Sequence, residues 1–397
     1  MDDKIELQTY KYDINIQLEE YFENDGINAS YLKLKISGND LYIKLINSLR
    51  RCVQTMIPTY AIPPELINIV ANTTKAYNND YMRSRLCELP VLGVDNDLYY
   101  LEDNYWRDIK YDDSLREKHE SEKNVELYVN VINKKSERIN VTTNDIKMII
   151  NNELVNPYNK EYPILIIKLK EGEKFECEMR AVLGVGLVNE RWGHANNSFY
   201  SYDPKKNICI FTVEGNQQCN EYDILIKGCK CLITKLTNIK NDFKLKLESK
   251  EIVEDCRLDL VLKNENHTIG EILNYELQNN KEILWSGITK PDYLIDEILI
   301  KMESIKSSKS PFNAIFDSID ELINKYSHIG KLIYNINDKF IYKRKHVKSD
   351  TDSKSDTDTD TETETDTNTE SDSDSESESD FKTTKESKKM PIKKNKK

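Results

Sequence analysis

Two long amphipathic helices with identical spacing constrain this sequence more than any other feature. Apolar residues recur at i, i+3, i+4, i+7, i+10, i+11 and i+14, starting from Tyr222 and again from Phe312. Each series forms one continuous apolar stripe along a helix, which is normally buried against a sheet or another helix. The stripes are Tyr222, Leu225, Ile226, Cys229, Leu232, Ile233 and Leu236, and Phe312, Ile315, Phe316, Ile319, Leu322, Ile323 and Tyr326.

A shorter helix precedes each long one. Asn39 and Asp40 are expected to cap the first short helix, and Asn266 to cap the second. Ser310 and Pro311 are typical of the start of the Phe312 helix. Asn39 and Asn47 are eight residues apart, as are Asn266 and Asn274. The sequence therefore indicates two copies of one unit: strand, short helix, strands and long helix. The copies either contain ordinary core helices or pair with each other, as a homodimer fused into one chain would.

A long insert, residues 63–205, separates the helices of the first copy. Its apolar and polar residues alternate over 125–131 and 164–169, as in strands that bury one face. Turn residues such as Asn156 and Pro157 separate these runs. We therefore expect a mostly β insertion domain.

The acidity of the chain is concentrated near its C-terminus. The formal net charge is −12, and residues 350–380 hold 14 acidic residues and one lysine. This stretch has no apolar residue, so it cannot bury enough surface to offset its chain entropy. Residues 381–397 hold eight lysines and one glutamate. We expect residues 346–397 to form a disordered tail, acidic and then basic. Its terminal lysines are either a nucleic-acid contact, a nuclear import signal or a solubilising terminus.

Membrane and secreted classes are not indicated. Apolar runs such as Pro163–Ile167 are far shorter than the roughly 18–20 residues that span a bilayer. The first residues lack the basic and apolar regions of a signal peptide, and the eight cysteines suit a reducing compartment. We expect a chain that is neither secreted nor bound to a membrane.

No catalytic constellation is recognisable. Gly184 and Gly186 begin a glycine-rich pattern, but Asn189 stands where a dinucleotide-binding loop needs its last glycine. The five histidines follow no metal-ligand spacing, and Cys229 and Cys231 face different sides of a predicted helix. We expect no catalytic residue, no cofactor and no metal site.

Arg50 and Arg51 are the exception among the polar residues. They are adjacent on the first short helix, so they cannot both point into a core. Guanidinium groups suit interface ion pairs, although a solvated helix flank explains them equally well.

The segment Asn47–Arg51, which contains these arginines, and the segment Ile57–Ile62 after it resemble the alpha-like subunits of DNA-directed RNA polymerase, in particular the third-largest subunit of eukaryotic RNA polymerase II. The later half is similar to the eleventh subunit, its smaller partner. The order of the matches over about residues 30–335 explains the internal repeat, because the two partners share one fold. The similar segments are Asn47–Arg51, Ile57–Ile62, Asn72–Thr74, Asp80–Tyr81, Arg85–Pro90, Gly184–Gly186, Trp192, Tyr202–Pro204, Phe211–Glu214, Asn266–Leu273, Leu284–Ile288, Pro291 and Ile298–Met302.

Two departures from that family are visible. The family's cysteine cluster for zinc is missing, since residues 91–123 contain no cysteine. Asn189, Glu190 and Arg191 replace the family's basic and histidine residues before Trp192. Fusion of both partners in one chain resembles the arrangement in large cytoplasmic DNA viruses.

The resemblance implies an α+β fold with two alpha-subunit-like dimerisation folds, each a sheet plus helices, in one chain. The expected domains are a third-subunit-like dimerisation domain (1–62 and 206–246), the insertion domain (63–205), an eleventh-subunit-like dimerisation domain (247–345) and the disordered tail (346–397).

The implied function is a non-catalytic assembly platform of a multisubunit RNA polymerase, whose active site lies in other chains. The implied partners are the largest, second-largest and small polymerase subunits, with DNA and RNA met only through the complex. The expected location is the virion and host cytoplasm for a viral protein, and otherwise the nucleus. The alternative is a free-standing acidic interaction protein or chaperone that acts through its tail.

The resemblance also suggests two sets of interface residues. Arg50 and Arg51 are expected to contact the second-largest subunit. The internal pseudo-dimer interface is expected to contain Leu45, Leu49, Leu225, Cys229, Leu232, Ile233, Leu236, Ile269, Leu273, Ile315, Phe316, Ile319, Leu322 and Ile323.

Overall fold

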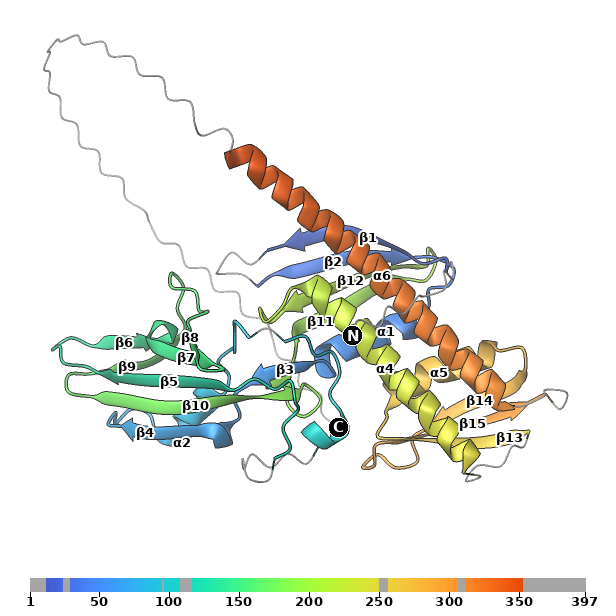
Figure 1. Ribbon diagram of the computed structural model, residues 1–397, viewed down its shortest axis with the longest axis horizontal. Coiled ribbons are helices and arrows are strands. Elements are labelled where there is room, and N and C mark those ends of the chain that lie inside the picture. Colours follow the sequence, from blue (N-terminus) through green and yellow to red (C-terminus); the bar gives the residue numbers. More distant parts are fainter. Residues whose placement is uncertain are drawn as a thin grey trace, which may run out of the picture. The chain divides into compact units, whose positions relative to one another are not determined.

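The chain has a mixed α+β fold built from helices and antiparallel sheets, in agreement with the predicted class (Figure 1). No helix in the described ranges is long and apolar enough to cross a membrane. The computed structural model describes residues 12–23, 29–94, 96–107, 116–249, 256–305 and 311–352.

A four-stranded antiparallel sheet with the order β1-β2-β12-β11 carries two helices, α1 and α4. Alternation sets its inner face: Leu32, Leu34 and Ile36 of β2 are buried, and the residues between them are only partly buried. We call these elements the first copy. They are β1 (Asn15–Phe22), β2 (Tyr31–Ser37), α1 (Ile43–Thr55), β11 (Ala195–Asp203), β12 (Ile208–Gly215) and α4 (Glu221–Glu248).

A three-stranded antiparallel sheet with the order β13-β15-β14 repeats this arrangement. Apart from β1, each sheet has its last strand in the centre, because the orders are β2-β12-β11 and β13-β15-β14. We call these elements the second copy. They are β13 (Arg257–Lys263), α5 (His267–Asn279), β14 (Ile283–Thr289), β15 (Glu297–Ser304) and α6 (Pro311–Asp352).

The helices of the two copies correspond when they are counted from their first residues. Helices α1 and α5 each have 13 residues, and the third, fourth, sixth, seventh, tenth and eleventh are buried in both. Helices α4 and α6 correspond in the same way, so Tyr222 matches Phe312 and Cys229 matches Ile319. In this register Asn47 matches Glu271, so the repeated asparagine spacing is not the structural correspondence.

The predicted caps are right for the second short helix and wrong for the first. The Asn266 side chain accepts a hydrogen bond from the backbone N–H of Thr268 at 2.8 Å, as an N-cap does. Helix α1 instead begins after Tyr42, which makes no side-chain cap bond. Asn39 and Asp40 bond to Asp13, far away in the sequence, and this long-range pairing displaces the local cap. Ser310 lies outside the described residues.

The insert contains a six-stranded sheet with its own core, separate from the core that the two copies share. Strand β3 lies outside residues 63–205 but pairs with β10 of the insert. Strand β11 lies within residues 63–205 but pairs with β12 of the first copy. Strand pairing over a long sequence distance sets the limits of the insert. The elements are β3 (Pro58–Ala61), β4 (Ile67–Asn72), α2 (Asn79–Leu86), α3 (Asp103–Trp106), β5 (Val125–Ile132), β6 (Ile139–Thr142), β7 (Ile146–Ile150), β8 (Glu153–Val155), β9 (Leu165–Leu169) and β10 (Lys174–Val185).

Helix α6 extends further than expected. The predicted disordered tail starts at residue 346, but the helix continues to Asp352. Once a helix is formed, each added residue gains a backbone hydrogen bond, so a helix can extend into polar sequence. The remainder of the predicted tail, residues 353–397, lies outside the described residues.

Candidate assembly interface

The two copies are joined by one continuous hydrophobic core. Buried residues of both sheets and of α1, α4, α5 and α6 belong to the same cluster. Eleven of the predicted interface residues are almost fully buried in this core, while Ile233, Phe316 and Ile323 pack against it and remain partly exposed. The eleven are Leu45, Leu49, Leu225, Cys229, Leu232, Leu236, Ile269, Leu273, Ile315, Ile319 and Leu322.

Helix α4 crosses α1 at Gly228. A Cβ atom added there would lie 2.6 Å from Cγ1 of Val53 and 3.1 Å from Cδ1 of Leu49. Only glycine lets the two helices approach this closely. Cys52 of α1 lies against the same point, with its thiol 3.5 Å from the Gly228 carbonyl oxygen.

Helix α1 contacts α5 of the other copy through polar groups. The Ser48 hydroxyl donates to the Thr268 carbonyl oxygen at 2.8 Å, and the Tyr42 hydroxyl donates to Glu276 at 2.7 Å. The rings of Tyr42 and Tyr275 stack with centroids 4.0 Å apart. These contacts satisfy buried polar groups across the boundary between the copies.

Helices α4 and α6 run side by side in opposite directions (Figure 1). Gly330 of α6 lies next to Cys229 of α4, since a Cβ at Gly330 would be 3.5 Å from the Cβ of Cys229. About three turns further along α4, Lys240 pairs with Asp320, earlier on α6. Tyr326 donates from its hydroxyl to the Leu45 carbonyl oxygen at 3.2 Å, which ties α6 to α1 as well.

Ion pairs between the copies share one polarity. In each such pair among the described residues, the cation comes from the first copy and the carboxylate from the second. The pairs are Lys44–Glu271 at 2.7 Å, Lys235–Glu265 at 2.8 Å and Lys240–Asp320 at 2.5 Å.

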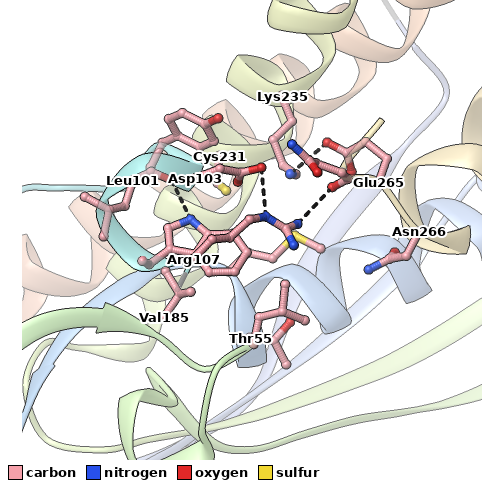
Figure 2. A pocket seen from close by; sticks show the side chains of 14 residues that line it. Thr55, Leu101, Asp103, Arg107, Val185, Cys231, Lys235, Glu265 and Asn266 are labelled. Carbon is pink, nitrogen blue, oxygen red and sulfur yellow. Dashed lines mark hydrogen bonds and ion pairs between the residues drawn. The ribbon is translucent and has the colours of Figure 1, made fainter. Parts of the chain in front are cut away.

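A small polar junction joins the insert to both copies (Figure 2). Lys235 reaches Glu265, which lies just before α5. Burial lowers the pKa of Lys235, but Glu265 and other nearby groups together raise it above its ordinary value. Arg107 lies over the Trp106 ring, 4.6 Å from its centroid, and bonds to Asp103 at 3.0 Å and Asp296 at 3.3 Å. The enclosed space, about 20 Å³, is roughly the size of one water molecule, so the junction is a structural link.

Sequence reasoning missed this junction. Lys235 could have indicated it, because a lysine beside an apolar stripe needs a buried anion. The pairing of Arg107 with Asp296 gave no local signal, since 189 residues of sequence separate them.

Arg50 and Arg51 lie outside the shared core. The Arg50 guanidinium donates to Asn47 at 3.0 Å and to Gln54 at 3.3 Å, both on its own helix. Arg51 is exposed overall. Desolvation of part of its side chain, and then the charge of Arg50, lower its pKa. Their expected contact with the second-largest subunit stays a prediction.

Buried His194 and partly buried Cys219 form a pair next to α4, with 3.0 Å between Nε2 and Sγ. Burial lowers the pKa of His194 to about 3 and raises that of Cys219 to about 12. Both groups are therefore neutral at pH 7, unlike the thiolate that a cysteine nucleophile requires. No group of three or more potential metal ligands occurs in the described part of the chain.

Comparison with known proteins gives two matches. Residues 257–331, from β13 into α6, match the family described as the RNA polymerase Rpb3/Rpb11 dimerisation domain. A curated relative, "Putative DNA directed RNA polymerase subunit R470" of Acanthamoeba polyphaga mimivirus, is 25% identical over 323 residues, or 76% of this chain and 90% of the relative. Both matches agree with the resemblance found in the sequence. The chain is therefore a distant homologue of that viral polymerase subunit, and its second copy is a dimerisation domain of the Rpb3/Rpb11 type.

Proposed function

We propose that this chain is a non-catalytic assembly platform of a multisubunit DNA-directed RNA polymerase. Its two copies act as an intramolecular alpha-like pseudo-dimer that docks the two largest subunits. The observation that carries the proposal is the repeated strand order around one shared core, combined with the dimerisation-domain match in the second copy. The viral relative supports the polymerase assignment. A place in the virion and host cytoplasm is part of the proposal.

The polarity of the ion pairs supports pairing between unlike copies. Two first copies would lack Glu271, Glu265 and Asp320, and two second copies would lack Lys44 and Lys240. Charges left without their partners at an interface disfavour the wrong pairing. Fusion also raises the effective concentration of one copy for the other, to roughly millimolar or more.

The test is recovery of the polymerase complex on the tagged full chain. Replacing Arg50 and Arg51 by alanine is expected to lower recovery of the second-largest subunit at least tenfold and leave the fold intact. Replacing exposed Lys205 and Lys206 by alanine, on the β11–β12 turn, removes two cations elsewhere and is expected to change nothing. Failure of the wild-type chain to bring down any large polymerase subunit would falsify the proposal.

The tail alternative is tested in the same assay. Deletion of residues 353–397 removes the acidic and basic segments and keeps α6 complete. The platform proposal expects unchanged recovery of both large subunits. Loss of every partner on deletion would favour an interaction protein that acts through its tail.

A further inference from the structure

The crossing of α4 and α6 is closed at one end. Lys240 pairs there with both carboxylate oxygens of Asp320, at 2.5 and 2.6 Å. Lys240 and Lys244 also lie over the Phe316 ring, each 5.9 Å from its centroid. One ion pair and the aliphatic part of Lys240 thus cover the apolar seam between the helices.

The equivalent end of the crossing is open, because the corresponding residues differ. In the register that matches Tyr222 with Phe312, Gly330 stands where the closed end has Lys240. Lys230 stands where it has Asp320, and Ile226 stands where it has Phe316. The missing side chain at Gly330 leaves a groove of about 630 Å³, within the size range of ligand pockets.

The groove has an apolar floor and a cationic rim. Its lining includes Lys230 and Lys331 but no Asp or Glu. Lys230 lies 5.6 Å from the centroid of the Tyr99 ring, and among the described residues neither lysine belongs to an ion pair. Tyr334, also in the lining, is 59% exposed. The rim therefore presents positive charge to a group that enters the groove.

We propose that this groove binds a helical segment of a partner protein that presents a large apolar side chain and a carboxylate one turn apart. The apolar side chain fills the space above Gly330 and the carboxylate pairs with Lys230. The closed end gives the spacing between the two peptide side chains. There, one lysine side chain spans positions 240 and 320, which correspond to Gly330 and Lys230 of the groove. Side chains at i and i+4 of a helix cover a similar distance, about 5–6 Å between Cβ atoms. An open groove between two helices suits a third helix.

The probe is a fluorescein-labelled helical peptide, with Phe and Asp four residues apart on an alanine–glutamine host. Fluorescence anisotropy with the purified full chain measures its affinity. Changing the peptide Asp to Asn is expected to weaken binding about tenfold, and changing it to Lys to weaken it further. A Lys230→Gln chain should bind the Asp and Asn peptides equally.

Two substitutions of Gly330 test whether binding needs the open groove, without changing any charge. Gly330→Met places a long side chain in the groove and is expected to weaken binding of the Asp peptide at least tenfold. Gly330→Ala is the matched control, since its Cβ makes an ordinary 3.5 Å contact with Cys229 and leaves the groove open. Gly330→Ala should bind the Asp peptide with an affinity within about twofold of that of the unchanged chain. If Gly330→Met fails to give a native melting curve, Tyr334→Ser is used in its place. Tyr334→Ser is expected to weaken binding of the Asp peptide several-fold.

Equal binding of the Asp and Lys peptides, or unchanged affinity in the groove variants, overturns the proposal. Sedimentation of the chain without peptide tests a second copy as the occupant. Self-association that Gly330→Met abolishes would assign the groove to homodimerisation and would also overturn it. No polymerase subunit is present in these measurements, so the result is independent of the platform proposal.

Discussion

The first and second copies share an order of elements but neutralise an equivalent buried lysine differently. Lys325 at the centre of α6 pairs with Glu276, within its own copy, at 2.8 Å. Its equivalent on α4, Lys235, pairs with Glu265 of the other copy. The position equivalent to Glu276 is Cys52 in the first copy. The first copy therefore depends on the second for its charge balance, whereas the second provides its own.

The largest expected effect tests whether the two copies form one folding unit. Ile319→Asp and the equivalent Cys229→Asp each place a carboxylate in the shared core, which costs on the order of several kcal/mol. Each is expected to unfold both copies together. The circular dichroism signal and the fluorescence of the three tryptophans, of which Trp285 lies in β14, should change in one transition. Two separate transitions would contradict a shared core.

The unequal lysines give the next prediction. Glu265→Gln leaves Lys235 buried without an anion and is expected to lower the free energy of unfolding by about 3–5 kcal/mol. Glu276→Gln should cost less, because Glu321 remains 3.4 Å from Lys325. Urea unfolding of the two variants measures the difference. Equal losses of unfolding free energy would contradict the prediction that Lys235 depends more on its single carboxylate than Lys325 does.

Acid sensitivity is expected from His194, which directly precedes β11 of the first copy. His194 has its pKa lowered by burial to about 3, so its contribution to stability is complete above its ordinary pKa of 6.5 and is lost as the pH falls from there toward 3. Between about pH 6 and 4 the free energy of unfolding should fall by about 1.4 kcal/mol per pH unit.

The variant His194→Gln removes this titration and is expected to flatten that part of the pH profile. The second copy has Asn280 before β14, where its amide bonds to the Ala314 carbonyl and to Ser318 without titrating. An unchanged pH profile in the glutamine variant would assign the acid sensitivity to other groups.

The smallest expected effect concerns the ion pair at the closed end of α4 and α6. Asp320 is half exposed, so Lys240→Asp is expected to cost only about 1 kcal/mol. Adding Asp320→Lys restores an ion pair of reversed polarity and should recover most of the loss. A double-mutant cycle by urea unfolding measures the coupling, and additive losses would mean that this pair has no role in matching the copies.

Local periodicity predicted the helices well and the long-range pairings poorly. The stripes from Tyr222 and Phe312 gave both long helices and five buried positions on each, because a helix repeats its buried face every three to four residues. They missed other buried positions, such as Ile224 of α4. The cap at Asn39 failed because a distant residue, Asp13, takes its hydrogen bonds. The β3–β10 pairing lies beyond any local signal for the same reason.

The connection between the copies is short: eight residues lie between the end of α4 at Glu248 and the start of β13 at Arg257. A single translation product therefore supplies both halves in equal number. No orphan half accumulates for proteases to remove, and the stoichiometry needs no matching of two expression levels. A frameshift or early stop codon after Glu248 would leave Lys235 without its anion and expose the shared core, so such a truncated product would be open to degradation.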